Sequence, residues 1–372
     1  MANASGYPND SPGKKISRAT FWVNSLALMT HLQVPYRGSL VLTGEGGDIW
    51  TLDGFGIPRE SISAVDVSDE WFETLSEMFP GTNFLHGEAG RLAKKAPYNL
   101  ANLDFCNGLT ADNIETLVRV ASNADTLPCI IGVSSLRSRI HQNQKKPLTV
   151  KMPLRSRKQL LEYRESNGVY CGNQMLLSDP FDPGLAIKRA ESWLTHVAYE
   201  RFPKGVRRKL VTPSGKQTPI GNGIARVHAM VSCARVHLAQ KDIELSALST
   251  ICYHSRSNAT NGSAFVHGLI LAYASRHKDY VASRLSEYDG LVPYLEIPAA
   301  QGEDKLRELA LALSDKMPTG RVADILNIRT GTVAAWKAHR TMGTYDHLSV
   351  PDTIGETPPS KLLKNEYGYG LF

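Results

Sequence analysis

An alternation of short apolar runs with longer amphipathic segments between residues 40 and 133 most constrains the fold of this chain. The segments between the runs are long enough for helices, and residues 69–79 and 111–124 are amphipathic. Strands that alternate with helices are joined by right-handed crossovers and form a mostly parallel sheet. The sequence therefore predicts an α/β fold, with strands at LVLT (40–43), ISAVDV (62–67), NFLH (83–86), NLANLD (99–104) and CIIGV (129–133).

Two later apolar segments predict an antiparallel hairpin after these five strands. Residues 245–255 and 263–275 flank the sequence RSNATNG, in which Asn261-Gly262 is a strong hairpin-turn signal. Residues 19–32 have helical periodicity and precede the first strand. We expect a doubly wound, mostly parallel sheet with a terminal antiparallel hairpin, in a domain that spans residues 19–290.

The two ends of the chain do not continue the alternation of strands and helices. The first 15 residues lack the apolar region of a signal peptide, so we expect residues 1–18 to be a flexible arm. From Gly302 onward the pattern changes to short helical segments, which predict a small all-α module over residues 302–345. Residues 346–372 contain three prolines and are expected to form a loosely ordered tail.

Composition indicates a soluble globular protein. Apolar residues make up 42% and charged residues 21% of the chain, and no apolar run approaches the roughly 18 residues of a membrane helix. The five scattered cysteines form no CxxC pair, which argues against disulfides and points to a reducing cytoplasm. Four histidines and two cysteines in residues 228–267 lack metal-ligand spacing, so core or solvated histidines are favoured and no metal is expected.

Positive charge is concentrated in two stretches that we expect to be insertions. Residues 137–158 hold eight Lys or Arg and no acid, and residues 201–216 hold six and no acid. The other 28 basic residues are outnumbered by 36 acidic residues. Concentrated charge favours a polyanion such as nucleic acid, although two solvated loops would give the same pattern. The residues we expect to contact nucleic acid in the first stretch are Arg137, Arg139, Lys145 and Lys146.

The turn after the first strand, VLTGEGG, predicts a ligand that contacts the backbone. Gly44 and Gly46 let N–H groups approach a ligand without an intervening Cβ. The dinucleotide fingerprint fails because Ile49 stands at its third glycine, and no triphosphate-binding loop is present in the sequence. Asp66, twenty residues after Gly46, ends the second strand, where a carboxylate can accept hydrogen bonds from both ribose hydroxyls. A nucleoside-type ligand is favoured over a simple tight strand-to-helix turn.

These residues resemble those of class I S-adenosylmethionine-dependent methyltransferases, which have a Rossmann-like fold. The turn matches the family's glycine motif, AVDVS (64–68) its ribose-binding strand end, and HGEAG (86–90) the motif in which Glu88 would face the adenine. The hairpin suits the family's sixth and seventh strands, so the resemblance covers about residues 40–275. It implies S-adenosylmethionine as cofactor, bound by Thr43, Gly44, Glu45, Gly46, Asp66, Val67, Glu88 and Ala89.

The segment NLDFCNG (102–108) lies where the family's fourth strand delivers its catalytic motif. Amino-methylating DNA enzymes usually carry Asp/Asn-Pro-Pro-Tyr/Phe there, and this chain departs from that pattern. Asp104 could accept a hydrogen bond from an exocyclic amine while Phe105 stacks, so we expect Asp104, Phe105 and Asn107 to be catalytic. Cys106 lacks the Pro-Cys context of a nucleophile and reads better as a small hydrophobe. A further departure is Leu42, where the family commonly has an acid.

The segment 320–343 resembles a helix-turn-helix DNA-binding unit. Ala323, Asn327 and Val333 have the required spacing of a small residue, a turn residue and a β-branched residue. The second helix would begin near Thr330, and its polar side chains would reach phosphates and base edges in a major groove. A small helical bundle that docks a protein is the alternative. The residues expected to contact DNA are Arg329, Thr330, Thr332, Lys337 and Arg340.

Together these features predict a cytoplasmic S-adenosylmethionine-dependent methyltransferase that acts on nucleic acid, with double-stranded DNA as the favoured partner. The combination suits a bacterial or phage cytoplasm, involves no membrane and is compatible with a homo-oligomer. Two alternatives stay open. One is a catalytically inactive, methyltransferase-like DNA-binding or regulatory protein, and the other is an enzyme whose acceptor is RNA or protein.

Overall fold

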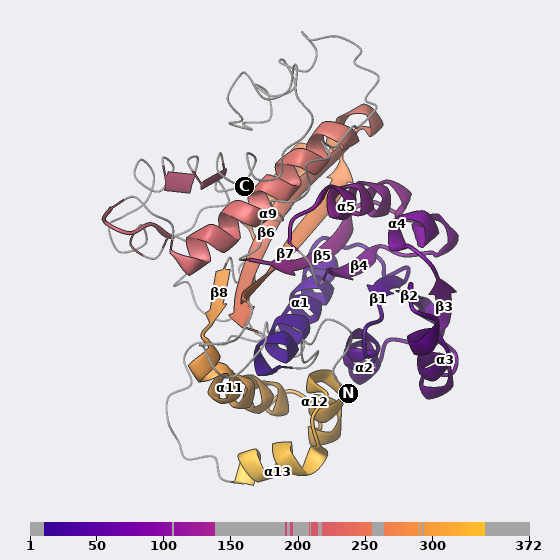
Figure 1. Cartoon of the computed structure of the whole chain (residues 1–372), viewed down its shortest axis with the longest axis vertical. Coiled ribbons are helices and arrows are strands. Elements are labelled where there is room, and N and C mark those ends of the chain that lie inside the picture. The colour runs from indigo at the N-terminus through magenta and orange to yellow at the C-terminus, as the bar shows by residue number, and fades with distance from the viewer. Residues whose placement is uncertain are drawn as a thin grey trace.

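A computed structural model shows one eight-stranded sheet with helices on both faces (Figure 1). The structure describes residues 11–105, 108–137, 190–191, 194–195, 208, 210–214, 218–254, 264–288, 290–291 and 294–338. The strand order across the sheet is β3-β2-β1-β4-β5-β7-β6-β8. The strands are β1 (Ser39–Leu42), β2 (Ile62–Asp66), β3 (Asn83–His86), β4 (Leu100–Asp104), β5 (Cys129–Leu136), β6 (Ile243–His254), β7 (Ala264–Ala274) and β8 (Tyr294–Ile297).

Strands β1 to β5 are parallel, and Val41 of β1 lies between Ala64 of β2 and Asn102 of β4. Strand β7 is antiparallel to both β5 and β6, so β6 runs in the same direction as β1 to β5. The predicted Rossmann-like, doubly wound sheet with an antiparallel hairpin is therefore confirmed. Strand β8, parallel to β6 at the sheet edge, was not predicted, because its four residues are mostly half-buried or exposed and lack a strong apolar pattern.

The helices form two layers around the sheet. Helices α1, α2, α3 and α10 share one hydrophobic cluster with the sheet, and α4, α5 and α9 share the cluster on the opposite face. None of the helices within the described ranges has the length and apolar character needed to cross a membrane. Their bounds are α1 (Pro12–His31), α2 (Gly47–Gly54), α3 (Asp69–Met78), α4 (Ala89–Leu92), α5 (Ala111–Asn123), α9 (Pro219–Leu238), α10 (Lys278–Ser286), α11 (Gly302–Ser314), α12 (Thr319–Leu326) and α13 (Thr330–Ala338).

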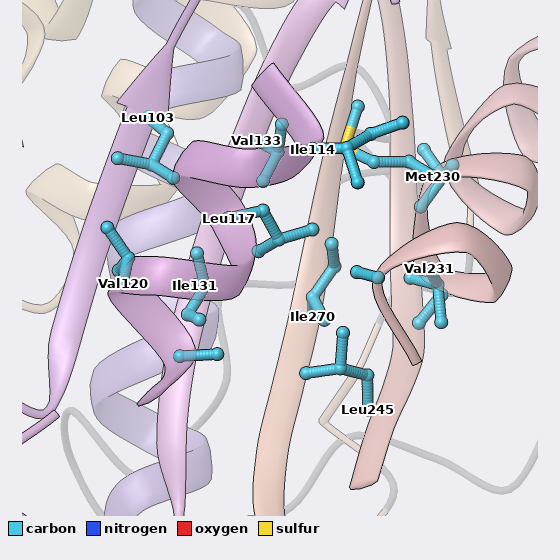
Figure 2. Close-up of a cluster of buried hydrophobic side chains, with 14 of the residues drawn as sticks. Leu103, Ile114, Leu117, Val120, Ile131, Val133, Met230, Val231, Leu245 and Ile270 are labelled. Atoms are coloured by element: carbon cyan, nitrogen blue, oxygen red, sulfur yellow. The ribbon is translucent and has the colours of Figure 1, made fainter. Parts of the chain in front are cut away.

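The core beneath α5 and α9 follows from the two periodicities of the sequence. Helical spacing places Ile114, Leu117 and Val120 on one face of α5, and alternation along β5 turns Ile131 and Val133 toward them (Figure 2). Residues of α9, β6 and β7 close the same cluster, among them Met230, Val231, Leu245 and Ile270. This core holds the central strands in place and so fixes the positions of their carboxyl ends.

Helix α1 begins earlier than the sequence periodicity predicts. Ser11 is its N-cap, with the hydroxyl accepting from the Lys14 backbone N–H at 3.3 Å, and Pro12 stands in the first turn, where its missing N–H costs nothing. Residues 12–18, expected to belong to the flexible arm, are thus the first two turns of a helix. Ile16, Ser17 and Arg18 in these turns are buried.

The C-terminal helices share a hydrophobic core with the N-terminal helix. Val322 and Leu326 of α12 cluster with Ile16 of α1, and the Thr51 hydroxyl donates to the Ile325 carbonyl at 2.9 Å. Gly54 of α2 lies so close to α12 that a Cβ atom there would be 2.7 Å from the Ile325 backbone nitrogen. Helices α11, α12 and α13 thus share one hydrophobic cluster with α1, and the domain boundary at residue 302 stays a prediction.

Replacing Leu117 by alanine is expected to destabilise the protein by about 2–5 kcal/mol, because it leaves a cavity beneath α5 where the side chain is fully buried. Urea unfolding gives the free-energy change. The control is Arg119→Ala on the same helix, which removes only an exposed ion pair with Glu115 and should cost less than about 1 kcal/mol. Equal losses in the two variants would contradict the packing described for α5.

Candidate nucleoside-binding site

The turn after β1 is tightly constrained on one side and open on the other. The Gly46 N–H donates to the Thr43 carbonyl at 2.7 Å, and Gly44 and Gly46 have φ angles of 46° and 77°. A Cβ atom at Gly46 would lie 2.6 Å from the Phe79 ring, whereas one at Gly44 would have no neighbour within 4 Å. Packing thus fixes the turn through Gly46, and Gly44 leaves an exposed stretch of backbone accessible to a ligand.

Asp66, the last residue of β2, is held in a fixed orientation beside this turn. One carboxylate oxygen accepts from the Ser68 N–H at 2.8 Å, and the other accepts a short hydrogen bond from the Thr43 hydroxyl. The Asp66 carbonyl also accepts from the Gly87 N–H at 2.7 Å. The side chain is half-buried, and each carboxylate oxygen retains a lone pair that can accept from a ligand.

The neighbouring predicted cofactor residues lie around Asp66 at the same end of the sheet. Val67 is 69% exposed, which is unusual for a β-branched apolar side chain next to a strand end. Glu88 is exposed, stands at the N-cap position of α4 and pairs with Arg91 at 2.8 Å, while the next residue, Ala89, is buried. Glu45, in the middle of the turn, is half-buried. The structure therefore brings an exposed apolar surface, a fixed carboxylate and open backbone to one place.

Asp104, at the end of β4, is ion-paired rather than free to bind an acceptor. Its carboxylate lies 2.6 Å from the Lys14 ammonium of α1. Burial raises the pKa of Asp104, but Lys14, Arg18 and His267 together lower the pKa to about 2. Sequence reasoning missed Lys14 because it placed this residue in the flexible arm.

The structure describes two of the three predicted catalytic residues, Asp104 and Phe105, and their side chains lie on opposite faces of the sheet. Phe105 packs against the cluster beneath α5 and α9, whereas Asp104 pairs with Lys14 of α1 on the opposite face of the sheet. In this arrangement Asp104 and Phe105 cannot contact one acceptor base together, as the prediction that Asp104 accepts from the amine while Phe105 stacks requires. The alternation of side chains along a strand is the reason, because successive residues point to opposite faces. Asn107 and Cys106 lie outside the described residues.

A buried chain of hydrogen bonds connects α1 to the start of α2. The Ser17 hydroxyl lies 2.8 Å from His267 Nδ1, and His267 Nε2 lies 3.1 Å from Asn102 Oδ1. Asn102 Nδ2 donates to Asp48 Oδ1 at 2.9 Å, and Trp22 Nε1 donates to the same oxygen at 2.7 Å. All five side chains are buried, so sequence reasoning had no local pattern with which to find them.

Burial is the main influence on the pKa values of His267 and Asp48 in this chain of hydrogen bonds. Burial lowers the pKa of His267 to about 4, although Asp104 opposes the change, so the imidazole is neutral at pH 7. Burial also raises the pKa of Asp48, against Arg18 and the hydrogen bonds from Asn102 and Trp22. A neutral His267 with its proton on Nε2 accepts from Ser17 and donates to Asn102, which satisfies every step of the chain.

The predicted nucleic-acid contacts that the structure describes fall in two places. Arg137 follows β5 and is half-buried, with its N–H donating to the Ala264 carbonyl at 2.7 Å. Arg329, directly before α13, is exposed, as are Thr330 and Lys337 on the helix, and Thr332 is half-buried. Arg139, Lys145, Lys146 and Arg340 lie outside the described residues.

The connection between α12 and α13 has the geometry that its residue types favour. Asn327 has a φ angle of 48°, a left-handed conformation that asparagine tolerates better than most residues, and its N–H bonds back into α12. Ala323 and Val333 are buried where the two helices meet. Helix α13 begins at Thr330, as the spacing predicts, and presents its small residues Gly331, Ala334 and Ala335 to solvent.

Comparisons with known proteins give fold-level similarity only. No family model and no curated protein matches the chain. Among solved structures, the plantazolicin methyltransferase BamL, in complex with a triazolic desmethylPZN analog and SAH, is 11% identical with a TM-score of 0.33 over 70% of this chain and 85% of its own. The plantazolicin methyltransferase BpumL with SAH is 11% identical with a TM-score of 0.32 over 71% and 85%, and the [4+2]-cyclase SpnF is 12% identical with a TM-score of 0.26 over 68% and 80%. At these values the assignment of the fold rests on the strand order itself.

The buried His267 predicts a specific pH dependence of stability. The pKa of His267 falls from 6.5 to about 4 on folding, so between these values the unfolded chain binds a proton that the folded protein excludes. Stability should therefore fall as the pH drops through this window. In His267→Gln the loss should be smaller by roughly 1–3 kcal/mol, measured by urea unfolding at about pH 7 and about pH 4.5.

Three other histidines with lowered pKa values, His228, His237 and His254, remain in that variant, so its pH dependence should shrink rather than vanish. The exposed His277→Gln is the matched control and should behave as the wild type. A His267→Gln variant with an unchanged pH dependence would contradict the buried, neutral state of this imidazole.

Proposed function

We propose that this chain is an S-adenosylmethionine-dependent methyltransferase whose cofactor binds at the carboxyl ends of β1 and β2. The observation that carries the proposal is the fixed Asp66 carboxylate beside the open backbone at Gly44. In doubly wound sheets a carboxylate at this position accepts hydrogen bonds from ribose hydroxyls. The strand order, with β7 antiparallel between β5 and β6, supports the same family resemblance.

The residues around Asp66 fit the remaining parts of a nucleoside. The exposed Val67 offers an apolar surface that a flat adenine ring would cover, which is favourable because apolar area leaves water. Ala89 and Glu88 would border the ring from the start of α4, with Glu88 leaving its Arg91 partner to accept from the exocyclic amine. Thr43, Glu45 and the glycines would present the backbone and side chains of the turn to the rest of the molecule.

Bound there, S-adenosylmethionine would supply an electrophilic methyl group on a sulfonium sulfur. The work of the chain is then chiefly to position the acceptor in line with that methyl group. Asp104, at the end of β4, is the residue predicted to hold the methyl acceptor, and it would have to release Lys14 before it could accept a hydrogen bond from an exocyclic amine. Phe105 would need to leave its hydrophobic cluster to stack on the acceptor. Asn107 stays a predicted catalytic residue.

The proposed acceptor is nucleic acid, with DNA favoured. Two acid-free stretches carry 14 of the 42 basic residues, and the described end of the first stretch, Arg137, follows β5 at the carboxyl edge of the sheet. The exposed Arg329, directly before α13, and the exposed Lys337 on it carry positive charge, and no acid lies between them in the sequence. The small residues on the exposed face of α13 would allow its backbone to approach a major groove closely.

A second candidate is a catalytically inactive DNA-binding protein that keeps this fold. The ion pair between Lys14 and Asp104 favours it, because the only predicted catalytic carboxylate is already neutralised by a residue of the same chain. The departure at Leu42 points the same way. This candidate would contact DNA through the same residues as the first candidate, but it would transfer no methyl group.

Asp66→Ala is expected to weaken binding of S-adenosylmethionine and S-adenosylhomocysteine at least tenfold, because it removes two hydrogen bonds to a charged acceptor, each worth about 1.5–3 kcal/mol. Isothermal titration calorimetry measures the change. Asp112→Asn, which alters an exposed acid on α5, should bind as the wild type does. Equal affinity in Asp66→Ala and wild type would remove the proposed site.

The double variant Arg329→Ala, Lys337→Ala is expected to bind duplex DNA more weakly at every sequence and to lower the slope of log affinity against log salt by about 1–2. Fluorescence anisotropy with a labelled duplex measures both quantities. Arg321→Ala removes an exposed cation from α12 and serves as control. If the double variant loses affinity for a labelled RNA instead of the duplex, RNA becomes the proposed acceptor. If it loses affinity for neither nucleic acid, protein becomes the proposed acceptor.

A further inference from the structure

Arg226, in the third turn of α9, is a buried arginine with an unused hydrogen-bond donor. The residue is only 5% exposed, and its Nε donates to Asn222 Oδ1 at 3.0 Å. Its Nη1 is enclosed and has no hydrogen-bond partner among the residues that the structure describes. A buried donor left without a partner costs about 1–3 kcal/mol, and more when the group is charged. Such a group in a folded protein points to a ligand that satisfies it.

The acid at this place, Glu191, binds Asn222 and does not accept from the Arg226 Nη1. Asn222 donates from Nδ2 to Glu191 Oε1 at 2.7 Å, so Glu191 orients Asn222, which in turn orients Arg226. Burial lowers the pKa of Arg226, Glu191 raises it, and the positive charge of Arg137 lowers it again. The charges of Arg137 and Glu191 therefore both act on the Arg226 guanidinium. Neither residue accepts a hydrogen bond from its Nη1.

The other groups at this place come from the carboxyl ends of β5 and β6. Arg137, immediately after β5, hydrogen-bonds the Cys252 thiol of β6. His254, the last residue of β6, has a buried Nδ1 that finds no hydrogen-bond partner within the described part of the chain. Burial lowers the pKa of His254 and Arg137 lowers it further, so at pH 7 the neutral ring can donate from that nitrogen. Helix α9 lies along β6 (Figure 1), and the positive charge of Arg137 acts on both Arg226 and His254, so the three side chains belong to one cluster.

We infer that this cluster of Arg226, Arg137 and His254 is a binding site for a phosphate group. A guanidinium matches the oxygen geometry of phosphate, and a tetrahedral anion has enough oxygens to accept from all three side chains. The site lies at the carboxyl edge of the sheet, where ligands of doubly wound folds bind. Arg137 also opens the stretch of residues 137–158, which holds eight Lys or Arg and no acid.

This site is separate from the proposed nucleoside site. Strands β1, β4, β5 and β7 lie between β2, which carries Asp66, and β6, which carries His254. The inference does not rest on the proposed methyl transfer, and S-adenosylmethionine binding by the same variants distinguishes failure of one from failure of the other. The phosphate could be a phosphodiester of nucleic acid or a free phosphate, and the experiment below tells these apart.

The first test is thermal unfolding in potassium phosphate against potassium chloride at equal ionic strength. Phosphate should raise the Tm of the wild type by roughly 2–4 °C at about ten times its Kd and leave that of Arg226→Met unchanged. Arg235→Lys is the matched control, because Arg235 is buried in the same helix but already donates from Nε to the Leu245 carbonyl at 2.7 Å. It should keep the full phosphate shift.

If Arg226→Met fails to fold, Arg226→Lys replaces it, since lysine keeps the charge but loses the planar fork and should show a smaller shift than Arg235→Lys. Absence of a shift in the wild type, or an equal shift in the Arg226 variant and the control, would overturn the inference. Calorimetry with S-adenosylmethionine on the Arg226 variant should match the wild type.

The source of the phosphate is identified by anisotropy with a labelled single-stranded oligonucleotide and a labelled duplex. A loss of oligonucleotide affinity of at least tenfold in the Arg226 variant, together with loss of the phosphate shift, identifies a phosphodiester. Loss of the shift with unchanged oligonucleotide affinity identifies a free phosphate or a small phosphorylated ligand. Both results support a phosphate site, and an unchanged shift contradicts it.

Discussion

The buried hydrogen-bond chain from Ser17 through His267 and Asn102 to Asp48 is the constraint on which the rest of the structure depends. Its members come from α1, β7, β4 and α2, so it ties the N-terminal helix and the start of α2 to two central strands of the sheet. Polar groups buried this deeply are tolerated only when each is satisfied, and a partly satisfied chain would be worse than an apolar core. The chain therefore specifies one position of α1 on the sheet, which apolar packing alone would leave less defined.

That position determines the geometry of the candidate site. Asp48 stands in the first turn of α2, directly after the glycine turn, so the hydrogen bonds from Trp22 and Asn102 hold the turn at the end of β1. The opposite end of α2 packs against α12, where Gly54 meets Ile325. The glycine turn is thus braced from both ends of the helix that follows it, and Asp66 is braced separately through Thr43 and Ser68. A ligand placed between them would meet groups that need little rearrangement, which favours affinity.

The same sequence features that predicted the fold explain why parts of the site stayed hidden. Strands β1 to β5 and the hairpin are apolar runs bounded by turn residues, and the chain order of such runs is enough to place Gly44 and Asp66 at one sheet edge. The pair Lys14–Asp104 joins residues 90 positions apart and leaves no periodic signal. Phe105 was misplaced because a motif read along the sequence ignores the alternation of faces along a strand. The site around Arg226 could not be predicted either, since its residues come from three separated segments and Arg226 resembles any other arginine in an amphipathic helix.

The central claim is that the carboxyl ends of β1 and β2 bind the nucleoside of S-adenosylmethionine. A crystal structure of the full chain with S-adenosylhomocysteine tests it most directly. Our account predicts both ribose hydroxyls within hydrogen-bond distance of the Asp66 carboxylate, the adenine against Val67, and the backbone at Gly44 in contact with the ligand. A ligand bound elsewhere on the sheet, or a crystal grown at saturating ligand in which Asp66 faces only Thr43, Ser68 and water, would contradict it.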